Sequence, residues 1–147
     1  SAAPVVATSN SGAVTLVAAT LSMGAYSAIN APGLISVTTT GDATIGQLNS
    51  SLSYAAASNT PSIIVTAGGV ASLGAIIDNG DGQTRFLVSG AGAEVSLSAS
   101  NGIGNATGRF TTNATRLSAS ASAGDIYLKA LTDTEVSLLS AVKGSVD

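Results

Sequence analysis

A short phrase of an apolar, a small and another apolar residue recurs along this chain, and it limits the possible folds more than any other feature. The seven copies are Val14-Thr15-Leu16, Ile35-Ser36-Val37, Leu52-Ser53-Tyr54, Leu73-Gly74-Ala75, Val95-Ser96-Leu97, Leu117-Ser118-Ala119 and Val136-Ser137-Leu138. Successive copies are 21, 17, 21, 22, 22 and 19 residues apart. A unit of this size cannot bury its own apolar face, so neighbouring copies must stack and share a core. The sequence therefore predicts an all-β fold, a parallel β-helix (β-solenoid) of about seven coils of roughly 20 residues.

Alternation within the phrase predicts which side chains are buried. Side chains of a strand point to opposite faces in turn, so the first and third residues share one face and the small residue lies on the other. We expect these residues to point into one interior: Val14, Leu16, Ile35, Val37, Leu97, Leu117, Val136 and Leu138.

Composition excludes several classes of function. The chain has no Cys and no His, which removes disulfides, thiolate chemistry, the common zinc sites and imidazole catalysis. The net charge is -3 with only five basic residues, so no dense cationic patch is available for nucleic acid or anionic membranes. We expect a protein that is not an enzyme and that binds no nucleic acid and no cofactor.

The 147 residues are interpreted as one β-solenoid segment or fibre subunit, in which Ser1 to Asn10 form an extended lead-in. The segment from Gly12 to Ile29 is uncharged and could be proposed as a membrane span. It contains several Ser, Thr and Gly residues and has no basic flank, and the uncharged stretch from Ser1 to Gly41 includes two of the phrases. We therefore expect strands in this region and no membrane span.

The carboxyl-terminal half resembles a known family. The segments Asn101-Gly-Ile-Gly104, Ala123-Gly-Asp-Ile-Tyr-Leu128 and Val136-Ser-Leu138 resemble the central repeats of filamentous haemagglutinin-type exoproteins. The likeness is best over Val88 to Asp147. It implies a right-handed parallel β-helix in a large bacterial surface adhesin, and it gives this segment the role of a shaft.

Carboxylates are the only candidates for metal binding or catalysis. Asn79, Asp81 and Gly82 match three positions of a calcium loop, but Ile77 stands where the first carboxylate is required. We interpret Asp78 to Gly82 as a plain Asn-Gly/Asp-Gly turn without metal.

A carbohydrate-active β-helix would need acids that recur one repeat apart on the solvent face. Asp125 and Asp147 have about this spacing, whereas Asp133 and Glu135 fit a solvated corner better. We expect no catalytic residues. Three glycosylation-type sequons begin at Asn49, Asn105 and Asn113, which is about the number expected by chance.

These observations favour a mechanical role: the structural shaft or a polymerising subunit of a bacterial extracellular fibre or surface adhesin, secreted or at the cell surface. Its partners would be other copies joined end to end, or flanking coils of the same polypeptide, with host or matrix carbohydrate as a further possible ligand. Two alternatives remain open. One is a β-sandwich filament subunit joined by strand donation, and the other is a carbohydrate-active β-helix protein.

Overall fold

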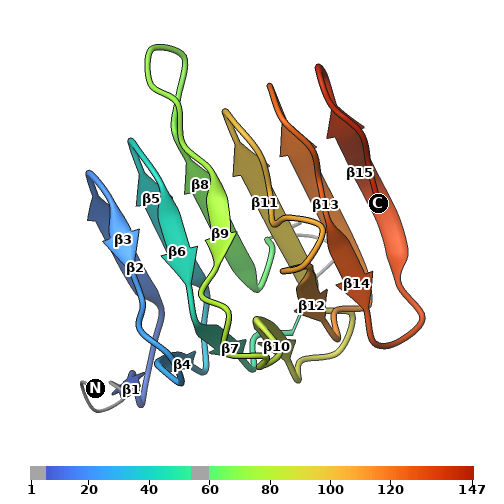
Figure 1. Cartoon of the computed structure of the whole chain (residues 1–147). Coiled ribbons are helices and arrows are strands. Elements are labelled where there is room, and N and C mark those ends of the chain that lie inside the picture. The colour runs from blue at the N-terminus through green and yellow to red at the C-terminus, as the bar shows by residue number, and fades with distance from the viewer. Residues whose placement is uncertain (1–5, 54–59) are drawn as a thin grey trace.

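The fold is built from β-strands arranged in three sheets (Figure 1). The computed structural model describes residues 6–53 and 60–147, and within these ranges all fifteen regular elements are strands and none is a helix. Every pair of named strands is parallel. The prediction of an all-β protein with parallel pairing is confirmed, and the β-sandwich alternative is wrong because it requires antiparallel strands.

Each sheet collects strands that are distant in sequence. Sheet A contains β1 (Val6–Thr8), β4 (Ala28–Ala31), β7 (Gln47–Ser50), β10 (Phe86–Val88), β12 (Phe110–Thr112) and β14 (Leu128–Ala130). Sheet B contains β2 (Val14–Ala18), β5 (Ile35–Thr39), β8 (Ile63–Ala67), β11 (Glu94–Ala99), β13 (Arg116–Ala121) and β15 (Glu135–Ala141). Sheet C contains β3 (Leu21–Ser22), β6 (Ala43–Ile45) and β9 (Ile76–Asp78).

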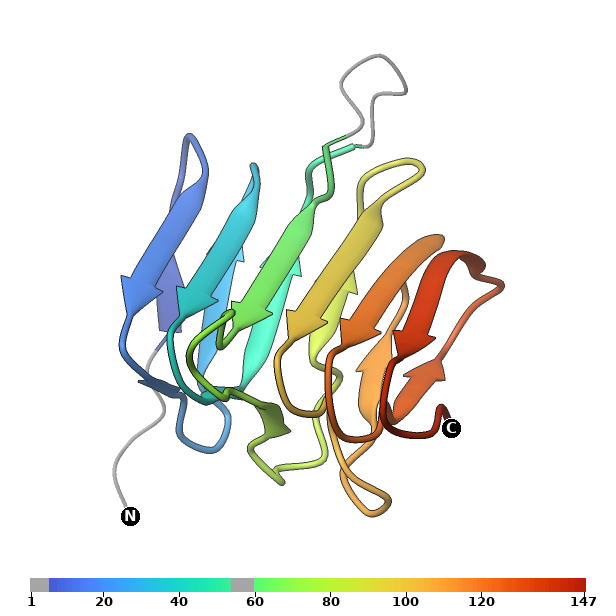
Figure 2. The same cartoon turned by 90° about the horizontal axis from the view of Figure 1, so that it is seen from above.

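The chain passes through sheets A, B and C in turn, so that β1, β2 and β3 are followed by β4, β5 and β6. Sheet C continues beyond β9 through single bridged residues, from Ile76 to Ile103, Ile126 and Val146. The strands of the first turn and those of the last turn consequently lie at opposite ends of the stack, as both views show (Figures 1 and 2). A β-solenoid fits this arrangement.

Residues of successive strands are aligned in columns that form the core. In sheet B one column consists of Val14, Ile35, Ile63, Val95, Leu117 and Val136. Its inner members are completely or almost completely buried, from Ile35 to Leu117. The β-branched and Leu side chains of such columns pack between the three sheets, which is why a chain with few aromatic residues has a continuous apolar interior.

Five of the seven phrases lie in sheet B as predicted, and two do not. Leu52 and Ser53 lie outside the strands, Tyr54 lies outside the described residues, and Leu73-Gly74-Ala75 precedes β9. The strand that takes this place is β8, whose outward residue Ile64 is apolar and hides the alternation. The phrases therefore located the correct sheet but misplaced its third strand.

A bulge in β15 corrects the prediction for Leu138. The register shifts after Leu117, so that Ser118 pairs with Leu138 and Ala119 pairs with Leu139. Ser118 points outward, hence Leu138 points outward as well and Leu139 takes the inward position. One extra residue, Ser137, has moved the side chains that follow it to the other face.

The remaining interior predictions depend on position in the sheet. Ile35, Val37, Leu97 and Leu117 are buried as expected. Val14 and Leu16 are only half-buried, and Val136 is 51% exposed. The reason is that β2 and β15 are the terminal strands of sheet B, and no further strand of the described residues covers their inward side chains.

The region that could have been a membrane span forms β2, β3 and the start of β4. Among the described residues no helix has the length and apolar character needed to cross a membrane. Within the expected lead-in, Val6–Thr8 form β1, which pairs with β4, and residues 1–5 lie outside the described residues.

Candidate functional site

The carboxyl-terminal end of the stack exposes an apolar surface. Six of the eleven exposed large hydrophobic side chains among the described residues lie between positions 131 and 146. They are Leu131, Val136, Leu138, Leu139, Val142 and Val146. Apolar side chains that gather at the open edge of a sheet are typical of a protein contact surface.

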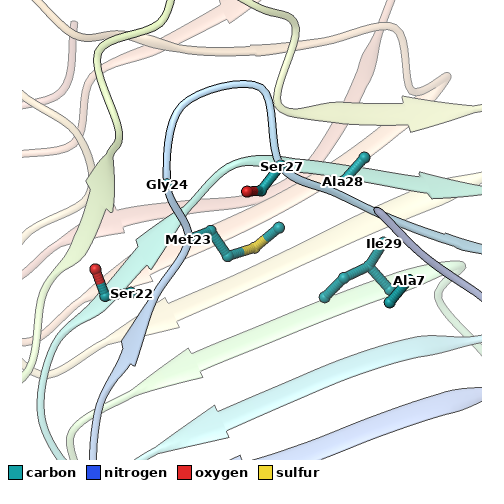
Figure 3. Close-up of a pocket in the computed structure, with 7 residues that line it drawn as sticks. All are labelled: Ala7, Ser22, Met23, Gly24, Ser27, Ala28 and Ile29. Atoms are coloured by element: carbon teal, nitrogen blue, oxygen red, sulfur yellow. The ribbon is translucent and has the colours of Figure 1, made fainter. Parts of the chain in front are cut away.

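A pocket of about 350 Å³ lies at the amino-terminal end of the described stack. The pocket is lined by Ala7, Ser22, Met23, Gly24, Ser27, Ala28 and Ile29, which come from β1, β3, β4 and the corner between sheets C and A. Figure 3 shows the Met23 side chain between Ser22 on one side and Ile29 on the other, with Ser27 above it. None of these residues is charged, so the pocket is an apolar opening into the core, and the hydroxyl groups of Ser22 and Ser27 are its polar side-chain groups.

A third feature is a buried ion-pair cluster at the turn after β9. Arg85 is completely buried, and its guanidinium binds two carboxylates. Nε lies 2.8 Å from Asp78 Oδ2 and Nη2 lies 2.9 Å from Asp78 Oδ1, while Nη1 lies 2.5 Å from Asp81 Oδ1. The bidentate contact with Asp78 fixes the plane of the guanidinium, and Asp81 supplies the second negative charge.

Hydrogen bonds surround the Asp81 carboxylate. Burial by itself raises the pKa of Asp81, but backbone N–H groups of Gln83 and Tyr26 donate to the carboxylate, as do Arg85 and Asn79, and together they lower the pKa from 3.8 to about 2. Burial likewise lowers the pKa of Arg85, and the contacts with both carboxylates outweigh it and raise that pKa. Both groups of this pair are therefore held in their charged forms.

This cluster explains the Asp78 to Gly82 segment. The segment is a turn, as predicted, with positive φ at Gly80 and Gly82. Its two carboxylates face Arg85, which supplies the positive charge that a cation would otherwise bring. The absence of calcium here stays a prediction. Sequence reasoning missed the role of Arg85, because its spacing from Asp78 and Asp81 does not show how the turn between them folds back.

The acid pairs considered for catalysis have separate partners. Asp125 accepts hydrogen bonds from the Ser145 N–H at 2.7 Å and from the Tyr127 hydroxyl at 3.1 Å, and this carboxylate raises the pKa of Tyr127. Asp147 forms an ion pair with Arg109.

Asp133 and Glu135 are both exposed, and Glu135 contacts Arg116 at 3.2 Å. Within residues 6–53 and 60–147, no three acidic side chains cluster so that they could hold a metal ion.

Two of the three sequon asparagines have structural contacts. The Asn113 side-chain amide bridges the strands of sheet A: its Oδ1 accepts from the Val88 N–H at 2.8 Å and its Nδ2 donates to the Val88 carbonyl at 3.1 Å. Asn105 Oδ1 accepts from the N–H groups of Thr107 and Gly108 in an exposed loop. Asn49 lies half-buried in β7.

Small hydroxyl side chains form a column on the outward face of sheet B. Thr38, Thr66, Ser98 and Ser120 occupy equivalent positions of β5, β8, β11 and β13. Within this column the hydroxyl groups of Ser98 and Ser120 are hydrogen-bonded, with their oxygens 3.4 Å apart.

Comparison with known proteins does not assign this chain to a family. No protein-family model matches it, and no curated protein and no solved structure is significantly similar to it.

Proposed function

We propose that the three sheets form one β-solenoid, with six turns in the described residues instead of the expected seven or so. Each turn contributes one strand to sheet A, one to sheet B and one strand or bridged residue to sheet C. The turns are longer than 20 residues where loops are inserted, as between Ile35 and Ile63.

We further propose a mechanical function: the chain is a shaft segment or polymerising subunit of a bacterial extracellular fibre or surface adhesin of the filamentous haemagglutinin type. The observation that carries the proposal is the set of apolar columns, which run in register through the stack and end in exposed side chains such as Val136. Such a stack is stiff because each strand is hydrogen-bonded to the next, and its open ends favour contact with further strands.

The location follows from the role, so the chain is proposed to be secreted or at the cell surface. Its partners are other copies of the chain or flanking coils of the same polypeptide, and carbohydrate on a host or in the matrix is a further candidate ligand for the adhesin. Enzymatic activity is not part of the proposal. Asp78 and Asp81 form ion pairs with Arg85, and Asp147 forms one with Arg109.

Electron microscopy and analytical ultracentrifugation of the purified chain, together with the complete reading frame, test this proposal. We expect either filaments or a reading frame with further coils on at least one side. A stable monomer whose gene encodes only these residues, with both ends covered, would contradict it. Degradation of an acidic polysaccharide by the purified chain would instead favour the carbohydrate-active alternative.

A further inference from the structure

We propose that the carboxyl-terminal end of one copy binds the amino-terminal end of a second copy, so that all three sheets continue across the junction. The inference rests on the proposed self-association and specifies its partner, polarity and register. The surfaces involved are the terminal strands of the stack: β14, β15 and Val146 at one end, and β1, β2 and β3 at the other.

The number of strands in each sheet makes the two ends complementary in shape. The described chain begins in sheet A with β1 and ends in sheet C at Val146, and each sheet has six positions when the bridged residues of sheet C are included. The described stack therefore begins and ends at the same corner, the one between sheets C and A. A second copy can place its β1 beside β14, its β2 beside β15 and its β3 beside Val146 without a gap.

The side chains match column by column. Extending the observed register by one strand places an apolar residue of the second copy next to five inward residues at the carboxyl-terminal end. The five pairs would be Ala130 with Ala7, Val136 with Val14, Leu139 with Leu16, Ala141 with Ala18 and Val146 with Leu21. Each pair would complete a column whose inner members are already packed in the core.

Exposure supports this pairing. Val136 is half-exposed and Val14 is only half-buried, although the residues between them in the same column are at most 4% exposed. Joining the ends would bury both side chains and pair the free backbone groups of β2 and β15.

Charge supports it as well. The amino-terminal 41 residues contain no charged side chain, so this end brings no charge into the junction. At the other end, Lys129 and Glu135 pair in register with the outward residues Thr111 and Arg116, and both remain on the solvent face of a continued sheet. The junction therefore buries apolar groups of these strands without burying Lys129 or Glu135.

Pairing of two carboxyl-terminal ends fits the structure less well. A symmetric contact of this kind would add an antiparallel strand to β15. It would also leave the corners between sheets C and A of the two copies at different positions. The columns would then end at the junction instead of continuing.

The test uses the complete 147-residue chain and two variants, each of which blocks one end. Leu16→Lys introduces a charge on the inward face of β2, and Leu139→Lys does so on the inward face of β15. In sedimentation experiments we expect the unmodified chain to form open-ended oligomers, and each variant alone to associate about 100-fold more weakly or worse. A mixture of the two variants should form a 1:1 dimer, because the unblocked ends are complementary.

Matched controls are the outward neighbours on the same strands. Val17→Lys and Leu138→Lys change exposed side chains that point away from the interior, so both should assemble like the unmodified chain. Circular dichroism checks that all four variants keep their strand content.

Covalent trapping gives a second readout that does not depend on blocking an end. The chain contains no Cys, so Leu21→Cys combined with Val146→Cys introduces one thiol at each end of the same column. The two thiols of one copy are about 24 Å apart along the stack, too far for a disulfide, whereas across the proposed junction they are neighbours. Mild oxidation should produce a ladder of disulfide-linked oligomers.

The outcomes separate this inference from the proposed function. Dimers formed by either blocked variant alone would show contacts between like ends, which overturns the inference while self-association stands. If the double cysteine variant forms oligomers that oxidation does not link, the proposed register of the junction is wrong. A chain that stays monomeric at all concentrations would contradict both the inference and self-association, and would leave only the role of a shaft segment between further coils.

Discussion

Arg85 is the only charged residue among the buried residues that the structure describes, and its guanidinium lies against the turn after β9. Its ion pairs with two carboxylates, one of them bidentate, offset the free-energy cost of burying the guanidinium. A buried ion pair of this kind adds little net stability compared with apolar packing, but loss of one partner leaves an uncompensated charge. The cluster therefore fixes the conformation of the long turn between β9 and β10.

The low pKa of Asp81 predicts how acid affects the fold. The folded pKa of about 2 lies below the ordinary 3.8, so the unfolded chain binds a proton more readily than the folded chain. The stabilisation from Asp81 is complete above pH 3.8 and is lost as the pH falls to about 2, and its size is about 2 kcal/mol. Urea unfolding of the chain and of Asp81→Asn between pH 2 and pH 5 measures it. The variant should lose less stability on acidification, and equal slopes would show that the pKa is not lowered.

Leu97 provides the corresponding test of the apolar core. It is 1% exposed in β11 and is aligned with Val65 and Ala119 on the two neighbouring strands. Leu97→Asp would bury an unpaired charge between two turns and should cost several kcal/mol, on the order of 3 to 5.

Ser98→Asp is the matched control for this substitution, because Ser98 is exposed on the same strand. Thermal unfolding followed by circular dichroism gives both midpoints. A midpoint for Leu97→Asp equal to that of the control would contradict the stacked core.

At the level of strands, the bulge in β15 shows how one residue changes which face a side chain occupies. Ser137 is the extra residue, and the pairing on either side of it is continuous with β13. Deletion of Ser137 should leave every observed pair in place and remove only the irregularity, so the free energy of unfolding should change by less than about 1 kcal/mol.

Deletion of Ser96 is the opposite case. β11 has no bulge, so loss of Ser96 would turn the residues of one half of the strand to the wrong face, including Val95 or Leu97. Denaturant titration of the two deletion variants compares them directly. Equal destabilisation by both deletions would mean that the extra residue at 137 is needed for the fold.

The strands also show what the sequence could and could not predict. Alternation located β2, β5, β11, β13 and β15, because their outward positions next to the first apolar residue are small and polar. It missed β8, where Ile64 is outward and apolar, and it could not reveal sheets A and C, whose strands have two to four residues. Such short strands carry too few positions for a periodic signal.

The features of the candidate site were even less predictable. That Arg85 contacts Asp78 and Asp81 depends on how the turn folds back, and a composition or spacing argument contains no such information. The open apolar ends were anticipated in general terms, but Leu139 rather than Leu138 faces inward because of a bulge that alternation does not reveal.

At the level of the whole molecule, contacts between adjacent turns dominate, so a deletion should be tolerated according to where it joins the chain and not according to its length. Deletion of residues 94–115 removes one complete turn and joins Ala93 to Arg116. The Ala93 carbonyl already accepts a hydrogen bond from the Arg116 N–H, which shows that the two positions are one turn apart. β13 would then pair with β8, and Leu117 would follow Ile63 in the same column.

Deletion of residues 94–104 removes half as many residues but breaks the order of the sheets. It eliminates β11 and the bridged residue Ile103, so the chain would pass from β10 to β12 within sheet A and leave one layer of sheets B and C empty. We expect the shorter deletion to abolish cooperative unfolding, whereas the whole-turn deletion keeps a strand spectrum by circular dichroism and a single unfolding transition. An empty layer in two sheets should cost more than a shorter stack with intact columns. Greater damage from the longer deletion would therefore show that the molecule is not a stack of equivalent turns.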